Sequence, residues 1–255
     1  MVDRMTGKVA LVTGIGAGIG KATAHRFAAE GAVVIGCDVD PVRASASVAE
    51  AAEAGLKIDS VDSVDLTSPS DVRRFVAAAE SHGRIDVLVN AAAIPPHMAP
   101  VESMSYDGEW RPTIQGEVDL VFLACREAWP LLRASGRASI INFASVNASR
   151  GSRSLSMAHC ASKGAVRSMT KQLAVEGGPD GIRANCIVPG LVQTAATAQA
   201  GASSGSVSET IVARTLRGRL GVTDDIAWCA VYLGSDESAW VTGSDFTVDG
   251  GVLAV

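Results

Sequence analysis

The feature that most constrains this chain is a glycine-rich stretch near its start, TGIGAGIG at residues 13–20. The apolar residues 9–12 before it predict a short buried strand, and residues 21–29 after it predict a helix. Glycine permits positive φ and close approach of a ligand, and the first turn of a helix presents free N–H groups to an anion. The stretch therefore predicts a cradle for the pyrophosphate of a dinucleotide. A glycine turn without a ligand is the alternative.

An aspartate follows the second apolar run. Residues 32–37 predict a strand, and Asp38 stands directly after it. An acid roughly 20 residues past a glycine loop accepts both hydroxyls of the adenosine ribose and repels a 2′-phosphate, so Asp38 favours NAD over NADP. No Arg or Lys lies in the loop or directly after Asp38, although Arg43 comes one helical turn later. The alternative is a turn residue that ends the strand.

Strand and helix signals alternate along the rest of the chain. Further strands are predicted at 58–64, 85–89, 138–143 and 182–188, and helices at 41–54, 68–81, 105–132 with an interruption near Pro112, and 157–176. Near-continuous apolar strands between helices indicate a parallel sheet covered on both faces, in the α/β class. Because no linker, repeat or break in composition divides the chain, we predict one doubly wound domain over residues 1–255.

The segment 193–218 has a different composition. It is rich in Ala, Ser, Thr and Gly and has few large apolar side chains to anchor it. Few anchors mean low local stability, and the segment follows the end of a predicted strand, where α/β sheets bind ligands. We therefore predict a mobile lid over the substrate, with a surface insertion as the alternative.

Composition excludes several classes of protein. Hydrophobic residues make up 47%, yet no apolar run reaches the roughly 18 to 20 residues that cross a membrane. The net charge of −5 and the absence of a basic cluster argue against nucleic acid or an anionic membrane as a partner. No targeting segment is evident, so a cytoplasmic location is expected. Scattered cysteines without C-x-x-C spacing predict free, mostly buried thiols and neither a disulfide framework nor a zinc site. The five are Cys37, Cys125, Cys160, Cys186 and Cys229.

Several short motifs resemble, in their order, those of the short-chain dehydrogenase/reductase family, and the resemblance spans nearly the whole chain. The glycine stretch resembles the family's cofactor loop, Asp65 and Leu66 its adenine contact, and residues 90–93 its N-N-A-G segment. Residues 182–194 are similar to the region that holds the nicotinamide carboxamide, and 248–251 to the family's C-terminal strand and turn. The resemblance implies a Rossmann-like sheet of seven strands, a nicotinamide cofactor and a homotetramer formed through long helices and the C-terminal region. The cofactor-binding residues expected from the motifs, together with Asp38, are Gly14, Gly18, Ile19, Gly20, Val39, Asp65, Leu66, Asn90, Lys163, Val192 and Thr194.

The catalytic positions match the family only in part. The family moves a hydride with a serine, a tyrosine, a lysine four residues after the tyrosine and an asparagine on the preceding long helix. By resemblance, Ser145 matches the serine and Lys163 the lysine. His159 stands where the family has tyrosine, and Glu117 stands where it has asparagine. The resemblance therefore implies an atypical active site.

Histidine suits the proton-transfer role on chemical grounds. A phenol, whose ordinary pKa is about 10, must be strongly acidified to act as a base at pH 7, whereas an imidazole, near 6.5, is mostly neutral there. We therefore expect His159 to be the general base of an alcohol oxidation, with Ser145 orienting the substrate and Lys163 holding the ribose. An imidazole reaches roughly 2 Å less far than a tyrosine, so a water or a deeply seated substrate must close the gap. Glu117 is a candidate second acid/base or a partner that neutralises Lys163.

The sequence thus predicts an NAD-dependent oxidoreductase that interconverts a secondary alcohol and a ketone. A lyase or dehydratase in which His159 and Glu117 act as acid and base is one alternative, and a catalytically silent NAD-binding protein is another. Arg150 and Arg153, in a loop that borders the family's substrate pocket, favour an anionic substrate if they act as a pair. Cys160 points about 100° away from His159 on a helix and is interpreted as a packed small residue.

Overall fold

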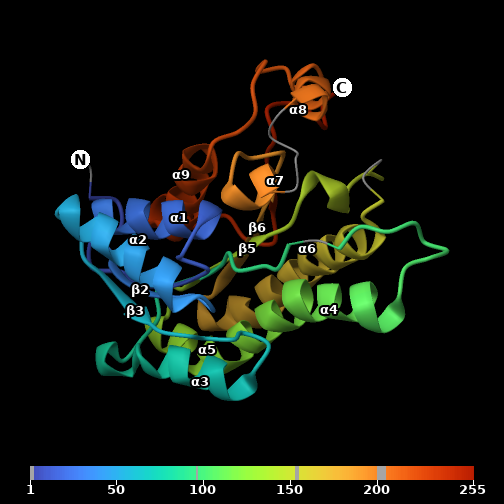
Figure 1. Ribbon diagram of the computed structural model, residues 1–255. Coiled ribbons are helices and arrows are strands. Elements are labelled where there is room, and N and C mark those ends of the chain that lie inside the picture. Colours follow the sequence, from blue (N-terminus) through green and yellow to red (C-terminus); the bar gives the residue numbers. More distant parts are fainter. Residues whose placement is uncertain (1–2, 96, 153–154, 200–204) are drawn as a thin grey trace.

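A computed structural model describes residues 3–95, 97–152, 155–199 and 205–255 of the chain. Its centre is one parallel sheet of seven strands in the order β3-β2-β1-β4-β5-β6-β7 (Figure 1). The strand order reverses between β1 and β4, and ligands of open α/β sheets bind at the carboxyl ends of the strands at such a point. The strands are β1 (Val9–Thr13), β2 (Val33–Cys37), β3 (Ile58–Val61), β4 (Val87–Asn90), β5 (Ser139–Phe143), β6 (Arg183–Pro189) and β7 (Asp245–Val248).

Helices cover both faces of the sheet. Figure 1 shows α1, α2 and α9 over one face and α3, α5 and α6 over the other. The predicted doubly wound α/β fold is therefore confirmed. The helices of the described residues are α1 (Gly18–Ala29), α2 (Pro41–Glu53), α3 (Pro69–Ala77), α4 (Arg111–Ile114), α5 (Leu120–Ser135), α6 (Met157–Gly177), α7 (Ala195–Gln199), α8 (Gly205–Val212) and α9 (Thr223–Gly234).

Alternate residues of each central strand fill two separate cores. In β1, Val9 and Leu11 join the core under α3, α5 and α6, whereas Ala10 and Val12 join the core under α1 and α9. All five residues of β1 are buried. This two-sided burial explains why the strands appear in the sequence as continuous apolar runs rather than as alternating ones.

The predicted interruption near Pro112 takes the form of π-helical turns rather than a break. The chain is helical from Tyr106 to Ser135, with π-helical turns at Tyr106–Trp110 and Gln115–Asp119. In the first of these, the N–H of Trp110 donates to the carbonyl of Ser105 at 3.1 Å. Because proline lacks the N–H that continues an α-helix, a local shift of the hydrogen-bond register accommodates Pro112.

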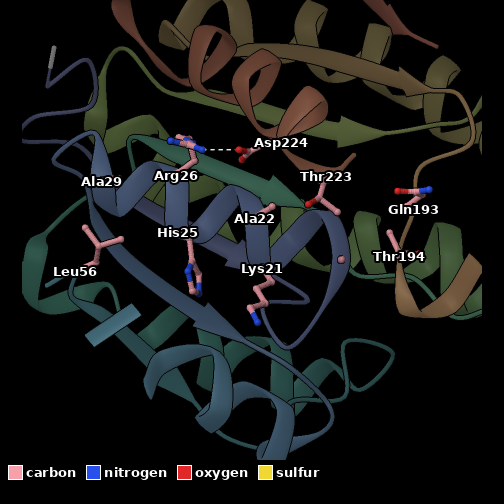
Figure 2. Close-up of a pocket in the computed structure, with 11 residues that line it drawn as sticks. Lys21, Ala22, His25, Arg26, Ala29, Leu56, Gln193, Thr194, Thr223 and Asp224 are labelled. Atoms are coloured by element: carbon pink, nitrogen blue, oxygen red, sulfur yellow. Dashed lines mark hydrogen bonds and ion pairs between the residues drawn. The ribbon is translucent and has the colours of Figure 1, made fainter. Parts of the chain in front are cut away.

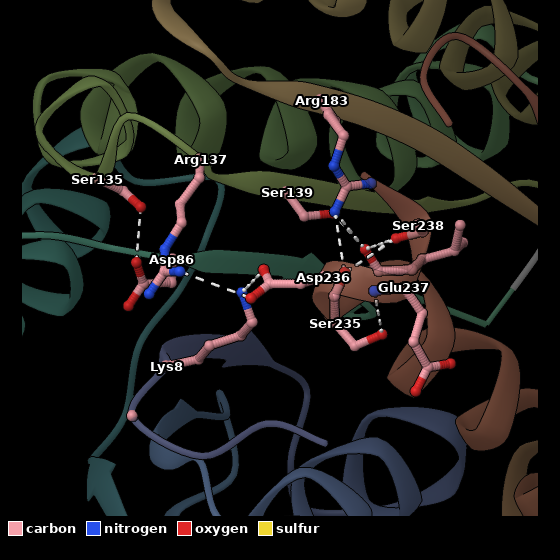
Figure 3. Close-up of polar contacts among 12 residues, drawn as sticks. Lys8, Asp86, Ser135, Arg137, Ser139, Arg183, Ser235, Asp236, Glu237 and Ser238 are labelled. Carbon is pink, nitrogen blue, oxygen red and sulfur yellow. Dashed lines mark hydrogen bonds and ion pairs between the residues drawn. The ribbon is translucent and has the colours of Figure 1, made fainter. Parts of the chain in front are cut away.

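A network of charged and polar groups closes the amino ends of the strands (Figure 3). The ammonium of Lys8 pairs with Asp236 at 2.6 Å, although Lys8 is only 3% exposed. The guanidinium of Arg183 donates to the carbonyls of Leu233 at 2.9 Å and Val241 at 3.2 Å, and burial lowers its pKa. These contacts cap the end of α9 and lie at the opposite edge of the sheet from the predicted site.

The segment 193–218 contains two short helices, α7 and α8, which follow the carboxyl end of β6. Residues 200–204 of the predicted lid lie outside the described residues. Among the helices of the described residues, none combines the length and the apolar character that crossing a membrane requires.

Candidate active site

The glycine loop is fixed to the neighbouring strand. Gly14 has φ of +74°, and a Cβ there would lie 2.9 Å from the Cα of Ala92. The hydroxyl of Thr13 accepts a hydrogen bond from the N–H of Ala92 at 3.0 Å and donates to the carbonyl of Val89 at 3.2 Å. Only glycine permits both the backbone conformation and the close approach, so the loop has one defined shape above β1 and β4.

The same loop leads into α1 without a side-chain cap. Ala17 is the N-cap residue, and it makes no side-chain hydrogen bond to the first turn. A Cβ on Gly20 would collide with the carbonyl of Gly14, which keeps the turn tight. Gly18 faces Thr194, because a Cβ there would lie 3.5 Å from the methyl carbon of Thr194. The uncapped turn presents N–H groups beside Ile19, so this cradle fits the pyrophosphate of a dinucleotide.

Asp38 lies beside the glycine loop. Its Oδ2 accepts from the N–H of Gly16 at 2.9 Å, and its Oδ1 accepts from the N–H of Asp40 at 3.0 Å. Val39 is largely exposed. Arg43 is close to Gly16, but its Nε pairs with Asp40 at 3.2 Å. Each carboxylate oxygen of Asp38 keeps a second lone pair, so the residue can still accept ribose hydroxyls.

Two other predicted cofactor residues direct their side chains into the protein. Leu66 is 6% exposed and belongs to the core under α3 and α5. Asn90, 2% exposed, donates from its amide to Asn142 Oδ1 at 2.8 Å and to Cys125 Sγ at 3.4 Å. Contacts of Leu66 and Asn90 with a cofactor must therefore come from main-chain atoms. Asp65, by contrast, is exposed, and its Oδ1 accepts from Thr67.

The stretch after β6 is held by local hydrogen bonds. Val192 is 4% exposed and pairs with Gly221 in an isolated bridge. The hydroxyl of Thr194 accepts from the N–H of Thr197 at 3.1 Å. These contacts place Thr194 opposite Gly18, so two of the predicted cofactor residues from distant parts of the sequence lie together.

Glu117 and His159 form a buried hydrogen-bonded pair. His159 belongs to the first turn of α6, and Glu117 to the π-helical turn Gln115–Asp119. The Nδ1 atom of His159 lies 2.7 Å from Oε1 and 3.0 Å from Oε2 of Glu117. The Glu117 side chain is 1% exposed and that of His159 is 15% exposed. π-helical turns recur at functional sites, and this one carries the carboxylate that meets the imidazole.

The electrostatics of Glu117 fix which ring nitrogen of His159 carries a proton. Burial raises the pKa of Glu117, but hydrogen bonds from His159 and Ser162 and the charge of Lys163 outweigh burial and hold that pKa below its usual value. The ionised carboxylate can only accept, so Nδ1 of His159 must be the N–H. The lone pair of the neutral ring is then on Nε2, the atom away from Glu117.

Ser162 is a member of this site that the sequence analysis did not identify. Its hydroxyl donates to Oε2 of Glu117 and also lies 3.0 Å from the carbonyl of His159. The sequence placed Ser162 directly before Lys163 but gave no sign of its partner, because the contact spans 45 residues. Ser162 and His159 therefore hold the Glu117 carboxylate from two sides.

The two positions that match the family pattern lie on the neighbouring elements. Ser145 follows β5 and caps a 3₁₀ turn, Val146–Ala148, where its hydroxyl accepts from the N–H of Asn147 at 3.2 Å. α6 packs against this turn. Lys163 is one helical turn after His159 on α6 and is 8% exposed. The carboxyl end of β5 and the start of α6 thus bring the predicted catalytic segments together.

Of the other predicted features, Arg150 and the cysteines are not part of this cluster around Glu117. Arg150 is exposed, and Arg153 lies outside the described residues, so the anionic-substrate hypothesis stays a prediction. Cys160 is half-buried, with Sγ 3.7 Å from the hydroxyl of Ser156. Within the described part of the chain the cysteines are free thiols, and no group of three or more His, Cys, Asp or Glu side chains is placed to hold a metal ion.

A hollow of about 580 Å³ lies on the outer side of α1 (Figure 2). It touches the predicted cofactor site only at Gly18 and Thr194, and it extends along Lys21 and His25 toward the ion pair of Arg26 with Asp224. Neither His159 nor Asp38 lines it. The hollow therefore adjoins the glycine loop from outside and is not the place where the catalytic residues meet.

Comparison with known proteins gives consistent matches along the chain. A family model described as enoyl-(acyl carrier protein) reductase matches residues 14–253. A 2,5-dichloro-2,5-cyclohexadiene-1,4-diol dehydrogenase of Sphingobium indicum is 36% identical over 259 residues, which cover 98% of each chain. A D-threitol dehydrogenase of Mycolicibacterium smegmatis is 34% identical over 253 residues, 97% of this chain and 94% of the relative.

Solved structures agree with these relatives. A gluconate 5-dehydrogenase of Burkholderia cenocepacia, in complex with NADP and tartrate, superposes with a TM-score of 0.91 at 31% identity, covering 100% of this chain and 99% of that chain. A levodione reductase superposes with a TM-score of 0.92 at 31% identity, covering 98% of this chain and 99% of that chain. The similarity therefore extends over the whole fold and includes all segments that build the candidate site.

Proposed function

The chain belongs to the short-chain dehydrogenase/reductase family, and from this membership we propose that it is an NAD-dependent oxidoreductase that interconverts a secondary alcohol and a ketone. The observation that carries the proposal is the buried hydrogen bond between Nδ1 of His159 and Oε1 of Glu117, at 2.7 Å. Because the Nδ1 position holds the N–H, Nε2 is the ring nitrogen that can take the proton of a substrate hydroxyl. The relatives named above are dehydrogenases and reductases, which supports redox chemistry.

His159 takes the role that tyrosine has in the family. In the oxidation, Nε2 accepts the hydroxyl proton as the carbon–hydrogen bond of the same carbon releases its hydride, leaving a ketone. A bound nicotinamide ring supplies the hydride acceptor. The carboxylate of Glu117 stabilises the imidazolium that forms, because an opposite charge at hydrogen-bond distance favours the protonated ring. In the reverse direction, Nε2–H returns the proton to the ketone oxygen.

Glu117 acts through His159 rather than on the substrate. Its carboxylate is 1% exposed, and both oxygens already accept hydrogen bonds, from His159 and from Ser162. We therefore assign Glu117 as a positioning residue in place of the second acid/base that the sequence suggested. Its hydrogen bonds are with His159 and Ser162, and we assign the Lys163 side chain to the nicotinamide ribose. Ser145 is assigned to orient the substrate oxygen.

We propose NAD as the cofactor because Asp38 stands beside the glycine loop as an acid that repels a 2′-phosphate. Arg43, the nearby cation, is paired with Asp40. The gluconate 5-dehydrogenase of Burkholderia cenocepacia holds NADP, so the proposal of NAD rests on Asp38 of this chain and not on the solved structures. The glycine cradle fits either dinucleotide, and Asp38 makes the distinction.

The test joins cofactor binding with turnover. NAD, NADH, NADP and NADPH are titrated by fluorescence, and absorbance of the reduced cofactor is then followed with a panel of secondary alcohols and ketones between pH 6 and 9. We expect tighter binding of NAD and NADH than of the phosphorylated pair, and turnover of at least one alcohol. Binding without turnover in either direction would contradict the oxidoreductase and favour a lyase or a silent NAD-binding protein.

We also propose that the protein is a homotetramer. An apolar hollow of about 490 Å³ lies between the outer sides of α5 and α6, which are the long helices through which the family resemblance implies assembly. Phe122, Trp129, Met169 and Leu173 line it. Light scattering coupled to size exclusion should give four times the chain mass of 26.1 kDa, and Trp129→Arg should reduce that mass. The cytoplasmic location stays a prediction.

A further inference from the structure

Ser162 gives the buried carboxylate of Glu117 its second hydrogen-bond donor. Its hydroxyl donates to Oε2 of Glu117, and its Oγ also lies 3.0 Å from the carbonyl of His159. A serine hydroxyl carries one proton, so it can serve only one of these acceptors at a time. The carboxylate is charged and only 1% exposed, which makes it the stronger acceptor of the two. The proton of Ser162 is therefore committed to Glu117.

The groups around Glu117 differ in how they respond to pH. Burial is the largest influence on the pKa of Glu117 and raises it, whereas hydrogen bonds from His159 and Ser162 and the charge of Lys163 lower it. Among the described residues, the titratable groups that act on this carboxylate are His159 and Lys163, both on α6. Ser162 is completely buried and does not titrate, so it remains a donor in every protonation state of the ring. Ser162 is thus the constant part of the surroundings that favour the ionised carboxylate.

The carboxylate is held in place from two sides. Its backbone lies in the π-helical turn Gln115–Asp119, where the N–H of Ile94 donates to the carbonyl of Gly116 at 3.3 Å. A Cβ on Gly116 would lie 2.7 Å from the side chain of Ile94, so this turn fits closely against the loop after β4. From the other side, Ser162 and His159 are three positions apart on the continuous helix α6, and side chains at this spacing share one face. The hydroxyl and the imidazole therefore meet the carboxylate together.

We propose that Ser162 is a positioning residue for the proton transfer, which acts through Glu117 and sets how readily His159 gives up its proton. The inference rests on the proposed role of His159 in the dehydrogenase. A hydrogen bond to a charged group favours the charged form. The bond from Ser162 is worth most when the ring is neutral, because an imidazolium at 2.7 Å already compensates the charge of the carboxylate. With the hydroxyl present, the pair of Glu117 and His159 therefore loses its proton at a lower pH than it would without it.

Ser162→Ala removes the donor and leaves the carboxylate. In a plot of kcat/KM for alcohol oxidation against pH, the rising limb should move to higher pH by about half a unit to one unit, because a hydrogen bond to a charged group exceeds one to a neutralised group by about that much. Ser162→Thr, which keeps the hydroxyl, should leave the limb at the wild-type position. Ser168→Ala, at an exposed serine on the same helix, is the matched control.

A double variant separates this role from a structural one. Glu117→Gln has no negative charge for Ser162 to stabilise, so adding Ser162→Ala to it should move the limb by less than about 0.3 unit. A packing defect would instead lower activity alike in both backgrounds and leave the limb of Ser162→Ala where it is in the wild type. An unmoved limb in Ser162→Ala, a shift to lower pH, or an equal shift in the Glu117→Gln background would overturn the proposal.

A measurement on the resting protein separates this inference from the proposed function. The ring ¹⁵N signals of His159, assigned by their loss in His159→Ala, are followed against pH without substrate. The midpoint of their titration should lie at higher pH in Ser162→Ala than in the wild type. This result without turnover of any alcohol would support the role of Ser162 and overturn only the dehydrogenase. Equal midpoints in the two proteins would overturn the role of Ser162 and leave the assignment of His159 standing.

Discussion

Replacing Glu117 by glutamine removes the negative charge beside His159 and changes little else. Glutamine has the same shape, its carbonyl oxygen can accept from Nδ1 of His159, and its amide can donate to the hydroxyl of Ser162. The variant therefore keeps the orientation of the imidazole but not the electrostatic stabilisation of its protonated form. Because the carboxylate is 1% exposed, water does not screen this interaction.

The expected loss is the difference between a hydrogen bond to a charged group, about 1.5 to 3 kcal/mol, and the neutral one that glutamine keeps, about 0.5 to 1.5 kcal/mol. Since about 1.4 kcal/mol corresponds to a factor of ten, this difference of about 1 to 1.5 kcal/mol should lower kcat/KM for alcohol oxidation roughly 5- to 12-fold. An imidazolium without its carboxylate partner forms less readily. In a plot of kcat/KM against pH, the rising limb should therefore move to lower pH. The plateau that it reaches at high pH should be lower than in the wild type.

The assay is NAD reduction under kcat/KM conditions from pH 5 to 9.5, with NADH binding measured alongside to show that the fold and cofactor site are intact. Glu53→Gln, at an exposed position at the end of α2, is the control and should behave as wild type. An unchanged plateau and an unchanged rising limb in Glu117→Gln would refute the positioning role. A shift of the limb to higher pH would refute the sign of the electrostatic argument.

Three further predictions concern the cofactor, the core and acid stability. Asp38→Ala should improve NADP relative to NAD by about tenfold in kcat/KM, because it removes the carboxylate that repels the 2′-phosphate; an unchanged ratio would contradict this. Phe27→Ala should lower the free energy of unfolding by about 3 to 5 kcal/mol, since the Phe27 side chain is 0% exposed in the core under α1 and α9. Val42→Ala, at an exposed residue, is the control and should lower it by less than about 0.5 kcal/mol. The pKa of Glu117 is lowered in the folded state, so its stabilisation is present above the unfolded value near 4.5 and is lost as pH falls through the lowered one. The difference in melting temperature between wild type and Glu117→Gln should accordingly shrink between pH 7 and pH 3, as differential scanning fluorimetry can measure.

Much of the fold was predictable because each element carries its own local signal. The strand β1 is apolar at every position since it is buried on both faces, and Ser68 and Asp40 precede helices as side-chain caps. The ends of elements were less predictable: the predicted strand 58–64 includes residues 62–64, which lie beyond the end of β3 at Val61. Ser63 has φ of +48°, a backbone conformation that ends a strand and that no composition rule reveals.

The candidate site was predictable in its positions but not in its contacts. The sequence alone does not show that Glu117 and His159, 42 residues apart, bind each other, because that depends on how α6 packs against a π-helical turn. The same packing brings in Ser162. These partners are set by tertiary structure, and the local residue pattern around each is unremarkable for a helix or a loop.

The most direct test of the central claim is His159→Ala, assayed in both directions with NADH binding measured on the same preparation. We predict that kcat falls at least about 100-fold for alcohol oxidation and for ketone reduction, because a general acid–base contributes about 10²- to 10⁴-fold. The NADH dissociation constant should stay unchanged, since the cradle around Gly14 and Asp38 is untouched. Retention of wild-type kcat with intact NADH binding would contradict the assignment of His159 as the proton-transfer residue.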